Sequence, residues 1–185
     1  MSRLRYLILL LTLPLFTLAQ PDSYQRDIND VNGNGIRDDV DREIASLTSD
    51  ITEQTHLSYY AFFLSRFIET KGIKRAQSFA NMVEHMMCLK TEEHQIEIKS
   101  RILDSENSFS AYNRANSEVV RYMWLQSAIG SKNCAIERSP TDLDFWQFIQ
   151  AAYDEDICDR IKKNNRFSAD PMAKHDYARC IDETR

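Results

Sequence analysis

Glycine and proline are scarce in this sequence, with four of each among 185 residues. A sheet protein rich in tight turns needs more residues of these two types, and no stretch alternates apolar and polar residues between turn dipeptides. Glycine-rich phosphate loops, glycine-rich dinucleotide turns and the G-x-S-x-G nucleophile motif are absent as well. The sequence therefore predicts an all-α protein and contains no signature of those enzyme classes.

Long apolar runs are also missing, apart from one at the N-terminus. Residues 1–19, MSRLRYLILLLTLPLFTLA, place Arg3 and Arg5 before an apolar stretch that ends on small residues at Ala19. That stretch is shorter than the roughly 20 residues that cross a bilayer, and Pro14 interrupts it, so it is typical of a secretory signal peptide. We expect a periplasmic or secreted protein with no membrane span in the mature chain.

Positive charge is in deficit in the predicted mature chain, residues 20–185. Removing Arg3 and Arg5 lowers the number of Lys and Arg residues from 23 to 21 against 28 acidic residues, which gives a net charge of −7. A protein of this charge supplies little attraction for phosphates or anionic lipid headgroups. Nucleic acid and anionic membranes are therefore not expected partners.

Cysteine is limited to four residues, all in the mature chain. An even number in an exported protein favours two disulfides, for which four cysteines allow three pairings. We favour Cys158 with Cys180 and Cys88 with Cys134, because the first two lie on consecutive predicted helices that a short turn should place side by side.

Apolar residues recur at helical spacing through most of the chain. The first series, Val40, Ile44, Leu47 and Ile51, is out of phase with the series that follows it. The slip lies around Thr48–Asp50 and indicates either two helices or one bent helix. Further series follow, with expected helix ends at Gly72, at Gly130 and at Asn164–Asn165, and expected helix starts at Ser139–Pro140 and Asp170–Pro171. We predict a single compact domain of five to seven helices over residues 42–185, preceded by an N-terminal segment, residues 20–41.

Two of the four glycines lie in that segment, in NDVNGNGIRDDVD, residues 29–41. The spacing from Asp30 to Asp41 fits D-x-[DN]-x-[DN]-G with a terminal acid, a pattern that curls oxygen-bearing side chains round a calcium ion (Ca2+). Gly35 permits the sharp turn. The expected ligands are side-chain oxygens of Asp30, Asn32 and Asn34, the backbone carbonyl of Ile36, Asp38 directly or through water, and Asp41.

These residues resemble the calcium loops of the thrombospondin type 3 repeat, and they are similar to EF-hand and dockerin loops. The resemblance covers about 12 of 185 residues and implies calcium binding, not a biological role. No amphipathic helix precedes Asp30, so a sensor's opening motion is not expected. With three carboxylates the affinity should be modest, roughly 10⁻⁴ to 10⁻³ M. The alternative is a solvated turn that caps a helix beginning near Asp38.

Two other segments yield alternative functions. Glu84, His85 and His94, near Cys88, Glu92 and Glu93, are the first suspects for acid/base groups of an extracytoplasmic hydrolase, although they match no known metal or catalytic spacing. The aromatic run SYYAFFLSRFI, residues 58–68, is either core or a docking surface for a partner. Our leading hypothesis is an exported, calcium-binding, disulfide-stabilised binding or structural module with a protein partner and no catalytic residues; a third possibility is an interaction subunit of an envelope assembly.

Overall fold

The computed structural model of the chain describes residues 30–122, 124–130, 134–135, 147, 149, 151–152, 155–164 and 171–184. Within these ranges the protein contains eight α-helices and no strand, which confirms the all-α prediction and exceeds the predicted number of helices by one. No helix in the same ranges is long and apolar enough to span a bilayer. The predicted signal peptide, residues 1–19, lies outside the described residues.

The first two helices are α1, Asp38–Leu47, and α2, Ile51–Glu69. Asp50 separates them, because its side chain accepts a hydrogen bond from Glu53 N at 3.0 Å and so caps the N-terminus of α2. The phase slip in the sequence therefore marks two helices. Since α1 begins at Asp38, the last residues of the predicted calcium loop form its first turn.

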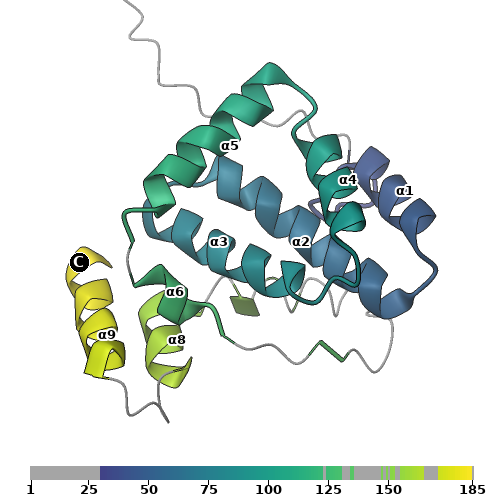
Figure 1. The fold of residues 1–185 in the computed structure, drawn as a ribbon. Coiled ribbons are helices and arrows are strands. Elements are labelled where there is room, and N and C mark those ends of the chain that lie inside the picture. The colour runs from purple at the N-terminus through teal and green to yellow at the C-terminus, as the bar shows by residue number, and fades with distance from the viewer. Residues whose placement is uncertain are drawn as a thin grey trace, which may run out of the picture.

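The centre of the molecule is α2, which lies beside α3, Gly72–Met86 (Figure 1). Its aromatic side chains are almost completely inaccessible to solvent, with Phe63 and Phe67 at 0% exposure. Helix α2 also contacts α1, α4 and α5, so it is covered on several sides. The aromatic run is therefore core, and the alternative of an aromatic docking face on this helix is wrong.

Gly72 was expected to end a helix, and this expectation is wrong. Helix α2 ends three residues earlier, at Glu69, and Gly72 is the first residue of α3. Its φ of 59° is one that L side chains rarely adopt, and its N–H donates to Glu118 Oε1 on α5 at 2.7 Å. The glycine thus serves the start of the next helix.

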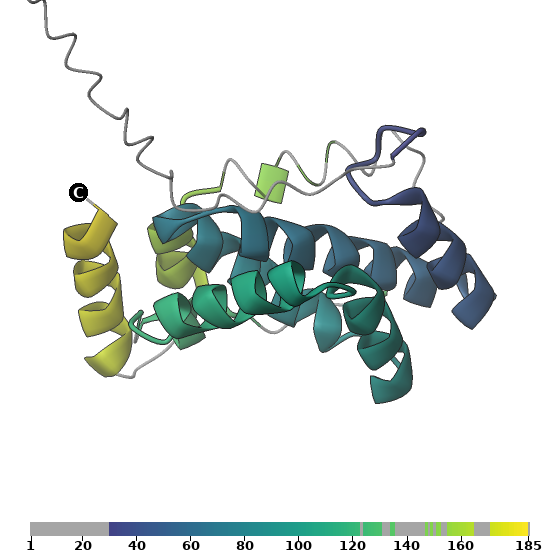
Figure 2. The same cartoon turned by 90° about the horizontal axis from the view of Figure 1, so that it is seen from above.

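Two further helices, α4, Glu92–Ile102, and α5, Glu106–Val119, pack on one side of the α2–α3 pair (Figures 1 and 2). Thr91 and Ser105 cap their N-termini, and Ser105 forms a reciprocal capping box with Ser108. The Tyr112 ring of α5 meets Phe67 of α2 edge-on, with 5.9 Å between ring centroids. These contacts extend the core from α2 into α5.

The C-terminal helices are α6, Leu125–Ala128, α8, Ile157–Asn164, and α9, Pro171–Thr184. Helix α6 contacts α3 and α8, and α9 packs against α8 at one end of the molecule (Figure 2). The expected start at Pro171 and the expected stop at Asn164 are confirmed. The helix expected to run from Ser139–Pro140 to Asn164–Asn165 is not continuous, because Glu155 and Asp156 are not helical. The start at Ser139–Pro140 lies outside the described residues.

Gly130 was expected to cap the helix that carries Tyr112, but that helix, α5, ends at Val119. Helix α6 intervenes before Gly130, whose N–H donates to Glu84 Oε1 at 2.9 Å.

The favoured disulfide pairing is confirmed. Cys158 of α8 is bonded to Cys180 of α9 with a Cα–Cα distance of 5.6 Å, and Cys88, just after α3, is bonded to Cys134 at 5.4 Å. The first bond links neighbouring helices, as expected. The second holds Cys134 to the end of α3.

Candidate functional site

The predicted calcium loop forms a compact turn directly before α1. Gly33 and Gly35 have φ values of 71° and 76°, in the left-handed region that glycine adopts without strain. No heavy atom lies within 4 Å of the position that a Cβ of Gly33 would take, so its backbone conformation, not space, requires glycine there. These two residues explain why a glycine-poor chain concentrates glycine at this place.

Backbone amides hold the oxygen atoms of the loop in place. The two carboxylate oxygens of Asp30 accept hydrogen bonds from Asn34 N at 3.1 Å and Gly35 N at 2.7 Å. Asn32 Oδ1 accepts from Asn34 N at 3.0 Å, and Asn34 Oδ1 accepts from Ile36 N at 2.8 Å. Because each oxygen has a second lone pair, these bonds orient the side chains without using their full capacity as acceptors.

The loop closes on Asp41, in the first turn of α1. Asp41 Oδ2 accepts from the amide nitrogens of Asn32 at 3.1 Å and Asn34 at 2.9 Å. Burial raises the pKa of Asp41 and the negative charges of Asp30 and Asp38 add to this effect, while the two amide hydrogen bonds oppose it. Asp38 Oδ1 accepts from Val31 N at 3.0 Å. All five side chains predicted as ligands are therefore bonded within one turn.

The sixth predicted ligand, the carbonyl of Ile36, belongs to the residue that anchors the loop to the core. The Ile36 side chain is only 2% exposed and lies in one apolar cluster with Val40 and Ile44 of α1. A change in the loop backbone must therefore move a core side chain.

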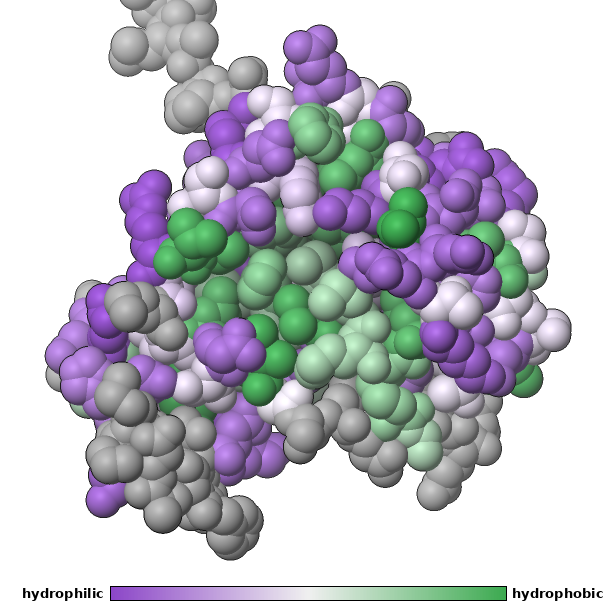
Figure 3. Space-filling view, viewed as in Figure 1, coloured by the Kyte–Doolittle hydropathy of each residue, from purple (hydrophilic) through white to green (hydrophobic). Residues whose placement is uncertain are grey.

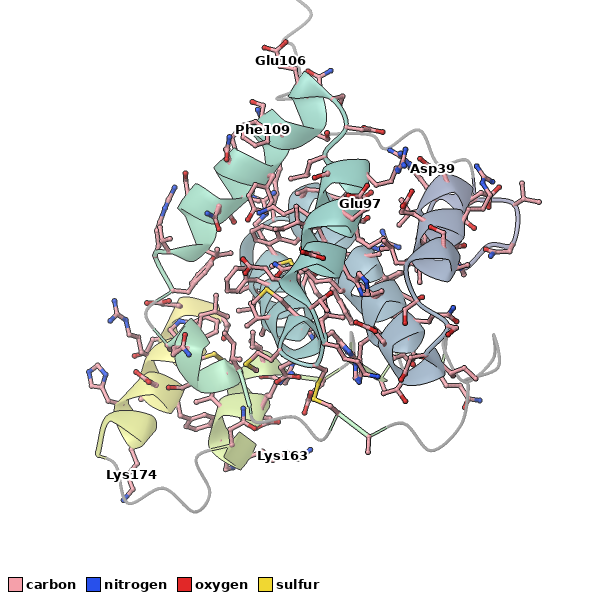
Figure 4. All side chains as sticks on the ribbon, turned by 45° about the vertical axis from the view of Figure 1, so that its right-hand side comes forward. Asp39, Glu97, Glu106, Phe109, Lys163 and Lys174 are labelled. Atoms are coloured by element: carbon pink, nitrogen blue, oxygen red, sulfur yellow. A yellow bond between two sulfur atoms is a disulfide. The ribbon has the colours of Figure 1, made fainter. Side chains whose placement is uncertain are left out.

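Arg37 links the loop to α4 and to the turn after it. Its guanidinium is paired with Asp39 at 2.6 Å and with Asp104 at 2.7 Å, and it donates to the carbonyl of Arg101 at 3.2 Å. Figure 4 shows Asp39 on the side of α1 that faces α4. The ion pair lowers the pKa of Asp39. Because Arg37 is engaged with these groups, its charge is directed away from the predicted ligands.

The donor chemistry of the loop fits a hard cation, since the predicted ligands are all oxygen atoms. In this arrangement, however, the N–H groups of Asn32 and Asn34 face Asp41, so both amides must turn before their oxygens and Asp41 share an ion. Across the described ranges, no three His, Cys, Asp or Glu side chains form a group that could hold a metal ion. The loop combines two carboxamides with three carboxylates.

The three suspected acid/base residues do not form one site. Glu84 is buried, forms an ion pair with Arg160 of α8 and accepts from Gly130 N. His85 is 1% exposed and contacts His56. His94 Nδ1 lies 2.9 Å from Glu53 Oε1, a carboxylate that is itself buried. Each suspect therefore has its own structural partners.

The sequence alone assigned no role to His56. The structure places His56 Nδ1 3.0 Å from His85 Nδ1 in the core. One signal was present in the sequence, because His56 precedes Tyr60 by four residues and so shares its buried helix face. Glu53, one turn before His56, was missed too. Both were missed because polar residues on a helix were assigned to the surface.

The large apolar side chains that are exposed to solvent lie outside the aromatic run, residues 58–68. Met87, Ile96 and Phe109 are each about half exposed, at 52%, 53% and 55%, near or on α3, α4 and α5. Figure 3 shows apolar residues gathered in the middle of the face that α3, α4 and α5 form, with polar residues around them. Val31, Ile51 and Val120 are exposed as well, at 85%, 50% and 72%.

Comparison of the chain with family models, with curated proteins and with solved structures finds no match.

Proposed function

We propose that this protein is an exported helical module that binds calcium at its N-terminal edge and acts by binding or as a structural element. The observation that carries the proposal is the geometry of the turn. Asp30, Asn32, Asn34 and Asp38 are all bonded within the same turn as Asp41, and the carboxylate of Asp41 experiences the charges of Asp30 and Asp38. Such a cluster of oxygens favours a cation.

Six groups would hold the ion: the side chains of Asp30, Asn32, Asn34, Asp38 and Asp41 and the carbonyl of Ile36. In the described part of the chain, no ion pair joins these three carboxylates to Lys or Arg. The ion would therefore supply the positive charge that balances them. The amides of Asn32 and Asn34 donate hydrogen bonds to Asp41. An ion held by Asp41 would take the place of these donors.

Calcium would stabilise the fold through the residues that follow the loop. Ile36 anchors the turn in the core, and Arg37 ties it to α4. Binding to the folded state alone stabilises a protein by RT ln(1 + [L]/Kd), which is about 0.7 to 1.8 kcal/mol at 2 mM calcium for a Kd of 10⁻³ to 10⁻⁴ M. Millimolar calcium, as found outside cells, is therefore sufficient for an effect.

Export is supported by two independent features. The N-terminal 19 residues have the composition of a signal peptide, and two disulfides are typical of a protein in an oxidising compartment. The apolar face of α3, α4 and α5 supports the further proposal of a protein partner. Sedimentation over a range of concentrations would detect a second copy as that partner through an increase in molar mass.

Titration calorimetry tests the calcium site directly. Residues 20–185 with intact disulfides should bind one calcium ion with a Kd of roughly 10⁻⁴ to 10⁻³ M. Asp41→Asn should abolish the heat of binding, while Asp182→Asn, the same change at an exposed position of α9, should leave it intact. Equal heats in all three proteins would contradict the proposal.

A further inference from the structure

The turn before α1 contains two successive Asn-Gly pairs, Asn32 with Gly33 and Asn34 with Gly35. The side chains of the two asparagines form matching hydrogen bonds. Each accepts through Oδ1 from the backbone nitrogen two residues further on, at 3.0 Å for Asn32 and at 2.8 Å for Asn34. Each also donates through Nδ2 to Asp41 Oδ2, at 3.1 Å and 2.9 Å. The two side chains are therefore held alike.

The backbone nitrogens of the two glycines differ. Gly35 N donates to Asp30 Oδ2 at 2.7 Å. Gly33 N makes no hydrogen bond within the part of the chain that the structure describes. Asn32 and Gly33 are exposed to solvent, whereas Asn34 and Gly35 are partly buried. The first pair is thus open to water, and the second is held by a carboxylate.

Asparagine is a chemically labile residue, and it reacts most readily when a glycine follows it, because no Cβ obstructs ring closure. The glycine nitrogen loses its proton to hydroxide, its lone pair forms a bond to the asparagine Cγ, and the side-chain nitrogen leaves as ammonia. Water then opens the resulting succinimide at one of its two carbonyl carbons. The products are aspartate or isoaspartate, and the net reaction exchanges ammonia for water without any oxidant or reductant.

The hydrogen bond from Gly35 N opposes two parts of this reaction. It stabilises the N–H form of the nitrogen, and the negative charge of Asp30 disfavours the anion that must attack. The nitrogen must also leave Asp30 before it can turn toward Cγ of Asn34. Breaking a hydrogen bond to a charged group slows a reaction about ten- to a hundredfold. Gly33 N has no such bond to break.

We propose that Asn32 is a site of spontaneous deamidation and that Asp30 protects Asn34 from the same reaction. The proposal does not depend on calcium binding. Either product at Asn32 replaces the amide that donates to Asp41 with a carboxylate, so the turn gains one negative charge. Isoaspartate in addition lengthens the main chain by one carbon atom. The protein therefore accumulates a modified turn as it ages.

Peptide mapping by mass spectrometry measures both sites in the same sample. The disulfide-bonded protein, residues 20–185, is incubated at pH 8 and 37 °C in EDTA and digested at intervals, and fragment ions separate Asn32 from Asn34. In the folded protein, we expect deamidation at Asn32 to be about ten- to a hundredfold faster than at Asn34. In the reduced chain unfolded in urea, the two rates should be nearly equal.

Three results would overturn the proposal. The first is equal rates at the two asparagines in the folded protein, or a faster reaction at Asn34. The second is a folded protein in which Asn32 does not react while the unfolded chain does. The third is a preference for Asn32 that is as large in the unfolded chain as in the folded protein, since the hydrogen bond of Gly35 N would then not be its cause.

The substitution Asp30→Ala tests the protection of Asn34. Because it removes the acceptor of Gly35 N, the rate at Asn34 should rise about tenfold or more, while the rate at Asn32 should stay close to that of the parent. A general loosening of the turn would instead accelerate both reactions alike. An unchanged rate at Asn34, or an equal rise at both asparagines, would refute protection by Asp30.

The matched control is Asp39→Ala, which removes a carboxylate from the first turn of α1. The two oxygens of Asp39 accept from Arg37, not from a glycine nitrogen. Both deamidation rates should therefore equal those of the parent. A rise at Asn34 in this variant as large as in Asp30→Ala would show that loss of negative charge, not loss of the hydrogen bond, sets the rate, and it would overturn the proposal.

Discussion

The substitution Asn34→Asp should destabilise the protein in the absence of calcium and should have little net effect on stability in saturating calcium. It removes the amide N–H that donates to Asp41 Oδ2 at 2.9 Å and adds a carboxylate beside Asp30 and Asp41. A hydrogen bond to a charged group contributes about 1.5 to 3 kcal/mol, and partial exposure of this pair favours the lower end. In EDTA, we therefore expect a loss of about 1 to 2 kcal/mol, or a melting temperature lower by about 2 to 8 °C.

Calcium should offset most of this loss, because a fourth carboxylate raises the negative charge of the ligand set and therefore its affinity for the ion. If the affinity rises tenfold, saturating calcium stabilises the variant by about 1.4 kcal/mol more than the parent. Thermal unfolding in EDTA and in 10 mM calcium measures both effects. Asn113→Asp, an added charge at an exposed position of α5, should show neither. A variant as stable as the parent in EDTA, or one whose gain from calcium is no larger, would refute the reasoning.

Three further results are expected. The ion pair with Lys90 lowers the pKa of Asp50, so this pair stabilises the fold above about pH 4 and the stabilisation is lost as the pH falls through the lowered pKa. Asp50→Asn keeps a capping side chain and should therefore flatten the dependence of the unfolding free energy on pH between about 5 and 3. Replacing both cysteines of the disulfide that spans 46 residues should cost about 0.7 kcal/mol more in denaturant unfolding than removing the one that spans 22. Ile36→Ala, at a core position, should cost about 2 to 4 kcal/mol in the same assay.

The helices and disulfides could be predicted because their signals are local. The apolar series before and after Asp50 differ in phase, and Asp50 caps the second helix, so sequence alone located that boundary. Cys158 and Cys180 lie on consecutive helices, α8 and α9, and their pairing followed from this order. The prediction for Gly72 was wrong because a glycine can stand at the start of a helix as well as at its end. Its contact with Glu118, 46 residues away, shows that it stands at the start of α3 and could not be predicted from the local sequence.

The polar interior could not be predicted, because its contacts join distant parts of the chain. His56 and His85 are 29 residues apart, and the Cys134 carbonyl is 78 residues from His56. Polar residues on a helix are usually solvated, so neither the histidine pair nor the buried pairing of Glu84 with Arg160 had a distinguishing pattern. The predicted calcium ligands are the opposite case, since the hydrogen bonds among them lie within 12 residues and their spacing is visible in the sequence.

Thermal unfolding of residues 20–185 across a titration of free calcium tests the central claim most directly, with Asp30→Ala as the control. Asp30 accepts from Asn34 N and Gly35 N, so the variant should melt at a lower temperature even in EDTA, and only the dependence on calcium is diagnostic. We predict a melting temperature that rises with free calcium in the parent and stays constant in Asp30→Ala. A melting temperature that is independent of calcium in both proteins would mean that NDVNGNGIRDDVD is only the turn that precedes α1.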